Sequence, residues 1–371
     1  MKRAIARAAP PLRGLRASRW AWVHGAAAAV AFAIAMPAAH AAEDHAAEDQ
    51  GGEVNVYSYR QPELIEPLFE RFTEETGIDV NVVFSGKGLI ERIKQLGPAA
   101  QADLLLTVDI GNLDQAVAEG IAAPVTTETL EEAVPSEYRA EDGSWWGLTR
   151  RARVVYASKD RVDQDAITYE ELAEPKWKNR ICIRSGQHVY NVALVASMIA
   201  RHGEEETKTW LEGVKANLAR KPAGNDRLQV KGVYAGECDV AIGNTYYMGV
   251  MATNEEEPEQ KEWADSVEIL FPNSEGRGTH VNLSGAVIVK DAPHKENAIK
   301  LLEFLASEEG QALYAEMNHE YPVREGVRWS ELVQSWGDFE ADDLSLQEIA
   351  EHRERASELI DEVNFDDGPS S

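Results

Sequence analysis

The sequence predicts an α/β protein in which short strands alternate with helices around mostly parallel sheets. The clearest strand, residues 54–59, is followed by an apolar stripe of helical spacing over residues 64–72. Residues 103–107 contain a continuous apolar run, as expected for a strand that is buried on both faces. With 44% hydrophobic and 27% charged residues, the 371-residue chain has the composition of a globular protein and the length for two lobes.

The remaining elements follow in the same alternation. The first helix can start at Pro62, because proline fits the first turn of a helix, and Gly77 is a natural end for it. Pro67 disturbs the apolar stripe and predicts a kink or a later start. The further elements are expected over residues 79–84, 89–96, 111–119, 153–157, 180–183, 192–201, 239–242, 287–289 and 298–306, with an acidic amphipathic helix over residues 344–363.

Residues 1–41 have the order of a secretory signal peptide. A basic region precedes an apolar run near residues 25–36, and Ala39-His40-Ala41 is a small-x-small cleavage site. An uncleaved membrane anchor is the alternative, since residues 20–42 contain no Asp, Glu, Lys or Arg. We therefore expect export to a bacterial periplasm, with residues 42–53 as a flexible leader.

Cys182 and Cys238 are the only cysteines, and neither lies near the signal, so no lipid anchor is expected. In an oxidising compartment, two cysteines indicate one disulfide. A bridge over so long a loop would stabilise the fold by roughly 4 kcal/mol in the chain-entropy account. The alternatives are two buried thiols or half of a metal site, but a zinc site needs further Cys or His ligands.

Acidic residues dominate the charge of the chain. The 64 Asp and Glu residues against 37 Lys and Arg residues give a net charge of −27 at pH 7. Such a chain repels a phosphate backbone, which argues against nucleic acid as a partner. An excess of hydrated carboxylates also favours a saline habitat.

Five motifs give the chain a resemblance to a known family. They are Val56-Tyr57-Ser58-Tyr59-Arg60-Gln61-Pro62, Lys87-Gly88-Leu89-Ile90-Glu91-Arg92, Ala102-Asp103-Leu104-Leu105-Leu106-Thr107-Val108-Asp109, Gly147-Leu148-Thr149-Arg150-Arg151-Ala152-Arg153-Val154-Val155-Tyr156 and Gly243-Asn244-Thr245-Tyr246-Tyr247-Met248-Gly249. Over about residues 54–323 the sequence resembles the periplasmic ferric-iron-binding proteins of ABC transporters, the bacterial transferrin-like group. The resemblance implies a two-lobed, type II periplasmic-binding-protein fold with the ligand in the cleft between the lobes. It also implies a monomer that delivers Fe³⁺ to a membrane permease and its ATPase.

The same resemblance divides the chain into two lobes. Residues 54–150, with a return segment at about 281–320, would form lobe 1. Residues 151–280, with C-terminal helices at about 321–363, would form lobe 2, and residues 364–371 are expected to fray.

Tyr246 and Tyr247 are the first candidate iron ligands. Fe³⁺ is a hard ion that favours anionic oxygen, and a phenol supplies it once the metal displaces the proton. The strand over residues 239–242 is broken by a glycine, and Asn244 can cap a helix that starts at Thr245. Both phenols would then lie near a helix N-terminus at the carboxyl end of a strand, where ligands bind in α/β sheets.

Two further tyrosines are expected to complete the site. The resemblance places a ligand one position after Tyr156, at Ala157, so Tyr156 would bind only if a bulge turns its side chain into the cleft. Otherwise Tyr156 packs in a core. Tyr59 ends the first strand in the opposite lobe, and Gln61 is a weaker contact there in place of the usual histidine of the family.

Charge compensation is expected from nearby arginines. Three phenolates neutralise Fe³⁺, and a fourth would call for a cation such as Arg60 or Arg153. If Tyr59 does not bind, carbonate or another small anion would complete the coordination, held by Arg150, Arg151, Arg153 or the Thr149 hydroxyl. Ion pairing at the surface or between lobes is the alternative role for these arginines. His188, in a polar turn before a helix, is a weaker candidate metal ligand.

Other functions are less well supported by the sequence. An exported hydrolase would need a nucleophile elbow or a zinc-protease motif, and neither G-x-S-x-G nor H-E-x-x-H occurs. A binding protein for a polyamine, thiamine or an oxyanion is the main alternative, because such sites use carboxylates, aromatic faces or backbone amides. We predict a binding protein and not an enzyme.

Overall fold

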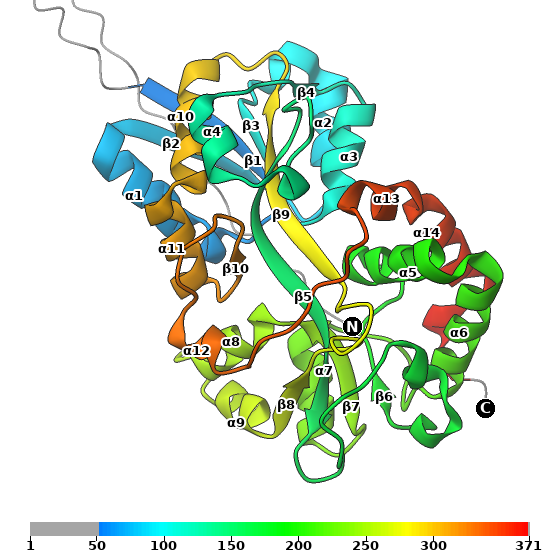
Figure 1. The fold of residues 1–371 in the computed structure, drawn as a ribbon. Helices are drawn as coiled ribbons and strands as arrows, with labels where there is room; N and C mark the ends of the chain where they lie inside the picture. The colour runs from blue at the N-terminus through cyan, green and yellow to red at the C-terminus, as the bar shows by residue number, and fades with distance from the viewer. Residues whose placement is uncertain (1–51, 370–371) are drawn as a thin grey trace, which may run out of the picture. The chain divides into compact units, whose positions relative to one another are not determined.

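The computed structural model describes residues 52–369, which fold into a mixed sheet with helices on its faces (Figure 1). Its main path has the order β2-β1-β3-β9-β5-β7-β6, with β4 beside β9 and with β8 and β10 beside β5. The strands are β1 Gly52–Ser58, β2 Ile78–Phe84, β3 Leu104–Thr107, β4 Ala122–Ala123, β5 Trp146–Ser158, β6 Ile181–Cys182, β7 Val240–Asn244, β8 Val267–Leu270, β9 Val281–Val289 and β10 Tyr321–Pro322.

Most helices lie between these strands along the chain, as the alternation of patterns predicts, and the last three helices of residues 52–369 follow β10. They are α1 Glu66–Thr76, α2 Leu89–Leu96, α3 Ile110–Ala118, α4 Glu128–Ala133, α5 Val189–His202, α6 Glu204–Ala216, α7 Asp226–Tyr234, α8 Tyr246–Ala252, α9 Glu259–Asp265, α10 Lys295–Ala306, α11 Glu308–Met317, α12 Glu331–Gln334, α13 Leu346–Glu351 and α14 Arg353–Glu362. Pro62 opens a short 3₁₀ turn, and α1 starts only at Glu66, so the later start that Pro67 predicts is what the structure has.

Two long strands, β5 and β9, connect the lobes. Within the first lobe β1 pairs in parallel with β2 and β3, and within the second lobe β6 pairs in parallel with β7. β5 and β9 run antiparallel: β9 joins β3, while β5 pairs with β9 up to Ala152 and with β7 from Arg153 onward. The two-lobed α/β prediction is confirmed, and the sequence-based division at residues 150/151 falls just before β5 changes partners.

The cores follow the strand patterns. In the first lobe, Val54, Val56 and Leu104 pack against Leu68 and Phe72 of α1. In the second lobe, a smaller cluster joins β5, β7, α7 and α9 and includes Cys182 and Cys238. These cysteines form a disulfide, as predicted, with their Cα atoms 5.8 Å apart, and the bridge ties β6 to the segment before β7.

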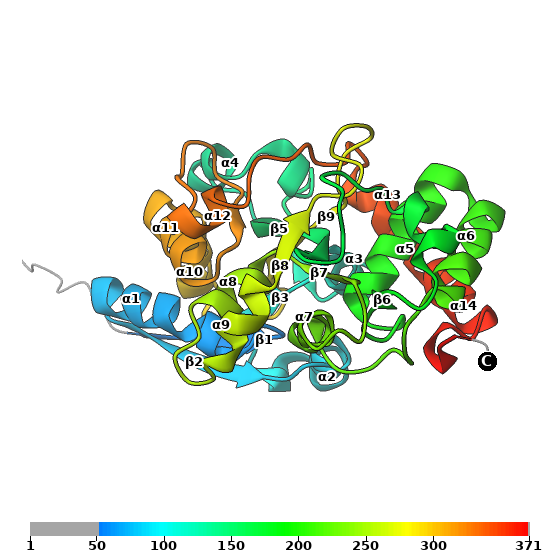
Figure 2. The same cartoon turned by 90° about the horizontal axis from the view of Figure 1, so that it is seen from below.

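The C-terminal helices pack on the second lobe. α13 and α14 lie beside α5, and α13 also contacts α3 (Figures 1 and 2). The expected fraying at residues 364–371 does not hold for its described part, because Phe365 is buried and a 3₁₀ turn covers Phe365–Asp367. Phe365 belongs to an apolar core cluster, and its turn contacts α6 and α14, which holds this segment in place.

The predicted signal peptide at 1–41 lies outside the described residues, as does nearly all of the leader at 42–53. Among the helices of residues 52–369, none is both long and apolar enough to cross a bilayer.

Candidate metal centre

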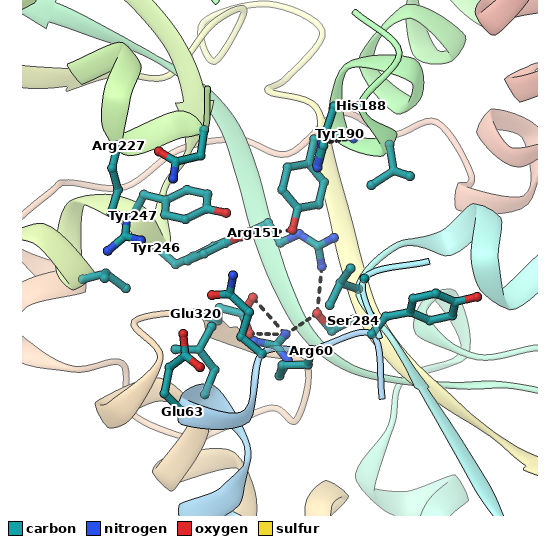
Figure 3. Close-up of a pocket in the computed structure, with 18 of the residues that line it drawn as sticks. Arg60, Glu63, Arg151, His188, Tyr190, Arg227, Tyr246, Tyr247, Ser284 and Glu320 are labelled. Atoms are coloured by element: carbon teal, nitrogen blue, oxygen red, sulfur yellow. Dashed lines mark hydrogen bonds and ion pairs between the residues drawn. The ribbon is translucent and has the colours of Figure 1, made fainter. Parts of the chain in front are cut away.

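A pocket of about 640 Å³ lies where the carboxyl ends of β1 and β2 face α5 and α8. β5 and β9 contribute Arg151 and Ser284 to it (Figure 3). The first lobe contributes Tyr59, Arg60, Gln61, Glu63, Leu64, Phe84, Gly86, Val108 and Asn112, and the second contributes Arg184, Gln187, His188, Val189, Tyr190, Asn225, Arg227, Tyr246, Tyr247, Val250, Asn254, Glu256 and Glu257. Glu320 completes the lining. This is the cleft expected from the fold.

Tyr246 and Tyr247 both line this pocket from the first turn of α8, with ring centroids 4.2 Å apart. The expected cap by Asn244 is not found: its side-chain oxygen instead accepts a hydrogen bond from Arg153 at 2.9 Å, and no side chain caps α8. The two phenols are placed by β7, which ends two residues before Tyr246.

Tyr190, which sequence reasoning passed over, is the third phenol on the second-lobe wall of the pocket. Its hydroxyl lies 3.2 Å from that of Tyr246, and the two rings point toward one another (Figure 3). Tyr190 stands in the first turn of α5, as Tyr246 does in α8. A search for tyrosines just after a strand-to-helix turn would have found it, because the signal that singled out Tyr246 is repeated there.

Three guanidinium groups surround the Tyr190 ring. Those of Arg151, Arg153 and Arg184 lie 5.4, 5.9 and 5.6 Å from its centroid. Positive charge at this distance favours a negatively charged phenol. The carboxylate of Asp226 pairs with Arg153 and Arg184 and offsets part of this charge, so Arg151 contributes the part that is not compensated.

Without a metal, the phenols of α8 hold their protons firmly. Burial raises the pKa of Tyr246 well above its ordinary value, and the neighbouring Tyr190 and Tyr247 raise it further. Burial raises the pKa of Tyr247 for the same reason, and Arg184 opposes the shift only weakly. Tyr246 and Tyr247 are therefore neutral oxygen donors that a strong Lewis acid can deprotonate.

Two buried arginines meet below the tyrosines. Arg60 and Arg151 both donate hydrogen bonds to the hydroxyl oxygen of Ser284, Arg151 at 2.9 Å. Arg60 is also paired with the buried Glu320 at 2.8 Å. Within residues 52–369 Arg151 has no carboxylate partner, and its Nε and Nη2 atoms are buried without hydrogen bonds. Arg151 thus leaves positive charge available to an anion in the pocket.

Four candidates from the sequence, Tyr156, Arg150, Arg153 and Thr149, do not line this pocket, and Arg150 donates to the Tyr138 hydroxyl at 2.8 Å instead. The Tyr156 strand segment pairs with β7 in regular register, and the irregularity of β5 lies instead between Gly147 and Thr149. No bulge turns Tyr156 into the cleft, so its ring is fully buried in the second-lobe core and its hydroxyl donates to the Asn244 carbonyl. The expectation that Tyr156 reaches the cleft is therefore corrected.

The expectation that Arg153 and Thr149 hold an anion in the pocket is also corrected. Arg153 is buried and bonds Asp226 at 2.7 Å, Asn244 and Asn191. The Thr149 hydroxyl donates to Glu320 at 2.7 Å. Both side chains lie in the wall behind the pocket, where carboxylate and amide side chains bind them. The sequence pattern did not reveal these partners.

The first-lobe candidates, Tyr59 and Gln61, both line the pocket, but the Tyr59 phenol oxygen is already hydrogen-bonded. Gln61 is exposed there. The phenol oxygen of Tyr59 accepts hydrogen bonds from the amides of Leu89 and Ile90 at 3.0 and 3.1 Å, which directs it to the start of α2. Burial raises the pKa of Tyr59, while these amides oppose the shift.

His188 lines the pocket but already has a structural role. Its Nδ1 atom accepts a hydrogen bond from the Tyr190 amide at 3.3 Å and caps α5. Burial lowers the pKa of His188 to about 3, and Arg184 adds to the effect, so the ring is neutral. In the described part of the chain, no group of three His, Cys, Asp or Glu side chains is placed to hold a metal.

Comparison with known proteins places the chain in a family. Residues 57–312 match the model of the bacterial extracellular solute-binding proteins. Iron uptake protein A1 of Synechocystis sp. is 46% identical over 316 residues, which cover 84% of this chain and 87% of that protein.

Solved structures of iron-binding proteins are also similar to this chain. The apo ferric ion-binding protein A of Pasteurella haemolytica is 50% identical with a TM-score of 0.81, covering 85% of this chain and 98% of that one. A Trichodesmium protein solved with iron and citrate ligands is 40% identical with a TM-score of 0.80, covering 85% of this chain and 100% of that one. The chain thus belongs to the bacterial extracellular solute-binding protein family.

Proposed function

We propose that this protein captures ferric iron with the phenolates of Tyr190, Tyr246 and Tyr247. The observation that carries the proposal is the meeting of these three hydroxyl-bearing rings in one pocket beside arginines (Figure 3). Three phenolates balance the charge of Fe³⁺, and hard anionic oxygen is the donor that this ion favours. The names of the relatives, an iron uptake protein and a ferric ion-binding protein, support this choice of metal.

A small anion would fill the remaining coordination positions. Arg151 and Arg60, held together through Ser284, are the candidates to bind it, in place of the Arg153 and Thr149 expected from the sequence. Carbonate suits this pair by size and charge, and the citrate bound by the Trichodesmium relative makes citrate a second candidate.

The setting that we propose is bacterial transport. After export and cleavage of the signal peptide, the protein would act as a periplasmic monomer. Closure of the lobes about β5 and β9 would cover the ion, and an ABC permease with its ATPase would open them for release. Binding and release require no covalent step, so we propose a carrier and not an enzyme. A carrier of a polyamine, thiamine or an oxyanion is the alternative.

Colour tests this proposal directly. Ferric salt added to the purified metal-free protein is expected to give a red to orange tyrosinate–iron absorption band, which citrate at low pH bleaches. Tyr247→Phe should abolish the band while the circular dichroism stays unchanged. Tyr234→Phe, on an exposed residue of α7, is the matched control and should keep the band. A wild-type protein that stays colourless and metal-free would overturn the proposal.

A further inference from the structure

The turn that carries Tyr190 is held from inside the second lobe. Residues 184–188 precede α5, and Asn191 of α5 donates hydrogen bonds to the carbonyls of Arg184 and Ser185 at 3.1 and 2.9 Å. Arg153 in turn donates to the Asn191 side chain at 2.6 Å. These contacts fix the inner side of the turn and leave its outer side to another segment.

The end of the chain holds that outer side. Asp366 accepts a hydrogen bond from the Gly186 amide at 2.6 Å and a second one from the Ser185 hydroxyl. A carboxylate that accepts from an amide and a hydroxyl makes stronger bonds than a neutral acceptor. The same Ser185 oxygen accepts from the Gln187 amide at 3.2 Å, so one carboxylate organises three successive residues.

α14 adds a second set of contacts. The Gln187 side chain donates to the Ser357 carbonyl at 2.9 Å and to Asp361 at 2.8 Å, and it accepts from the Ser357 hydroxyl at 2.7 Å. Gly186 packs so closely that a Cβ atom there would lie 2.8 Å from Ile360 and 2.9 Å from Phe365. The outer side of the turn thus fits against residues 357–366.

The same C-terminal segment reaches the first lobe. Arg353, at the start of α14, pairs with Asp109, which caps α3 and accepts a hydrogen bond from Asn282 of β9 at 2.8 Å. Gln347 of α13 donates to Asp114 of α3 at 3.0 Å. α13 lies between α3 and α5 in Figure 1, in agreement with these contacts. The segment is therefore fixed at both ends.

We propose that residues 353–367 are a positioning element of the metal centre: through Asp366 and Gln187 they hold the 184–188 turn so that the Tyr190 phenol meets those of α8. The significance of this positioning for iron rests on the proposed function. Asp366 acts through the turn and does not itself line the pocket.

Hydrogen exchange of the metal-free protein tests the positioning by itself. Asp366→Ala should speed exchange of the amides of residues 186–190 by about tenfold, the effect of losing roughly one charge-assisted hydrogen bond. Asp366→Asn should restore part of the protection, because its amide oxygen can still accept from Gly186. Asp367→Ala is the control, since the neighbouring Asp367 is exposed and lies 4.0 Å from Lys221. Equal exchange in the Asp366→Ala and Asp367→Ala proteins would overturn the proposal.

Iron gives the second readout. Asp366→Ala should keep a visible band but shift its maximum and release iron to a chelator about tenfold faster, whereas Asp367→Ala should match the wild type. Faster exchange with an unchanged band and release rate would overturn the link to the metal centre. A colourless wild type would refute the proposed function, and the exchange experiment would still decide whether Asp366 positions Tyr190.

Discussion

On the second-lobe wall of the pocket, Tyr190, Tyr246 and Tyr247 direct their phenols toward one another, whereas on the first-lobe wall Tyr59 has its phenol oxygen held by two backbone amides. The first wall adds the buried cation Arg60 and the neutral Gln61. We propose that the second wall supplies the phenol oxygens for a metal, whereas the first wall supplies no metal ligand and its Arg60 is paired with Glu320. A tyrosine at a cleft is a candidate ligand only when its oxygen is free to turn to the ion.

Proton release is expected to show the largest effect of this difference. Because burial raises the pKa of Tyr246 and Tyr247, these phenols are neutral at pH 7 before iron arrives. If the three phenols of the second wall all bind, each ion should displace about three protons, one per phenol, so affinity falls steeply as the pH falls. Titration with a pH indicator in weak buffer measures this. In buffer free of bicarbonate, which would release a proton of its own on binding as carbonate, about four protons would instead bring Tyr59 into the site.

Tyr190→Phe is expected to have the next largest effect. Removing a ligand should cost more than the roughly 10–100-fold loss that follows from removing a group behind a ligand. Iron affinity by competition with a chelator measures the loss. Tyr156→Phe is the comparison, because the Tyr156 ring is buried outside the pocket, and this variant should bind iron nearly as well as the wild type. The reverse result would return Tyr156 to the ligand set.

Arg151→Met tests whether free positive charge matters. Its expected loss of iron affinity is about 10–100-fold, as for other supporting groups of metal sites. Folding stability should change little, since Arg151 has no carboxylate partner among residues 52–369 to leave uncompensated. Arg150→Met is the control on the same strand, because Arg150 bonds Tyr138 away from the pocket. Equal affinities in the two variants would remove Arg151 from the anion site.

Tyr59→Phe is expected to have the smallest effect on iron. The two amides at the start of α2 would lose their acceptor, which should lower stability by about 1–2 kcal/mol. Iron affinity should stay within about twofold of the wild type, on the expectation that Tyr59 makes no metal bond. Denaturation and chelator competition together measure both. A loss comparable to that of Tyr190→Phe would contradict the division between the walls.

The fold was predictable because its signals are local. Alternating apolar runs and turn residues define β1 to β3 and their helices. The presence of two cysteines in a chain with an export signal indicated the disulfide that the structure contains. The boundary of the tail was not predictable in this way. Phe365 is buried by contacts with distant helices, which no local composition reports.

The site was only partly predictable for the same reason. Tyr246 and Tyr247 stand at a local turn that the sequence displays. Whether Tyr156 faces the cleft depends on the register between β5 and β7, and whether Arg153 is free depends on Asp226, which is 73 positions away. Such pairings are set by tertiary packing, so residue type and position on a strand could not decide them.

The contact between Tyr156 and Gly243 limits how this protein can vary. A Cβ atom on Gly243 would lie 2.3 Å from the Tyr156 ring, so even alanine would force the ring or the strand to move. A displaced strand would carry the Tyr246–Tyr247 pair with it. The two residues are therefore expected to change together among descendants of this sequence, a larger residue at 243 appearing only with a smaller one at 156.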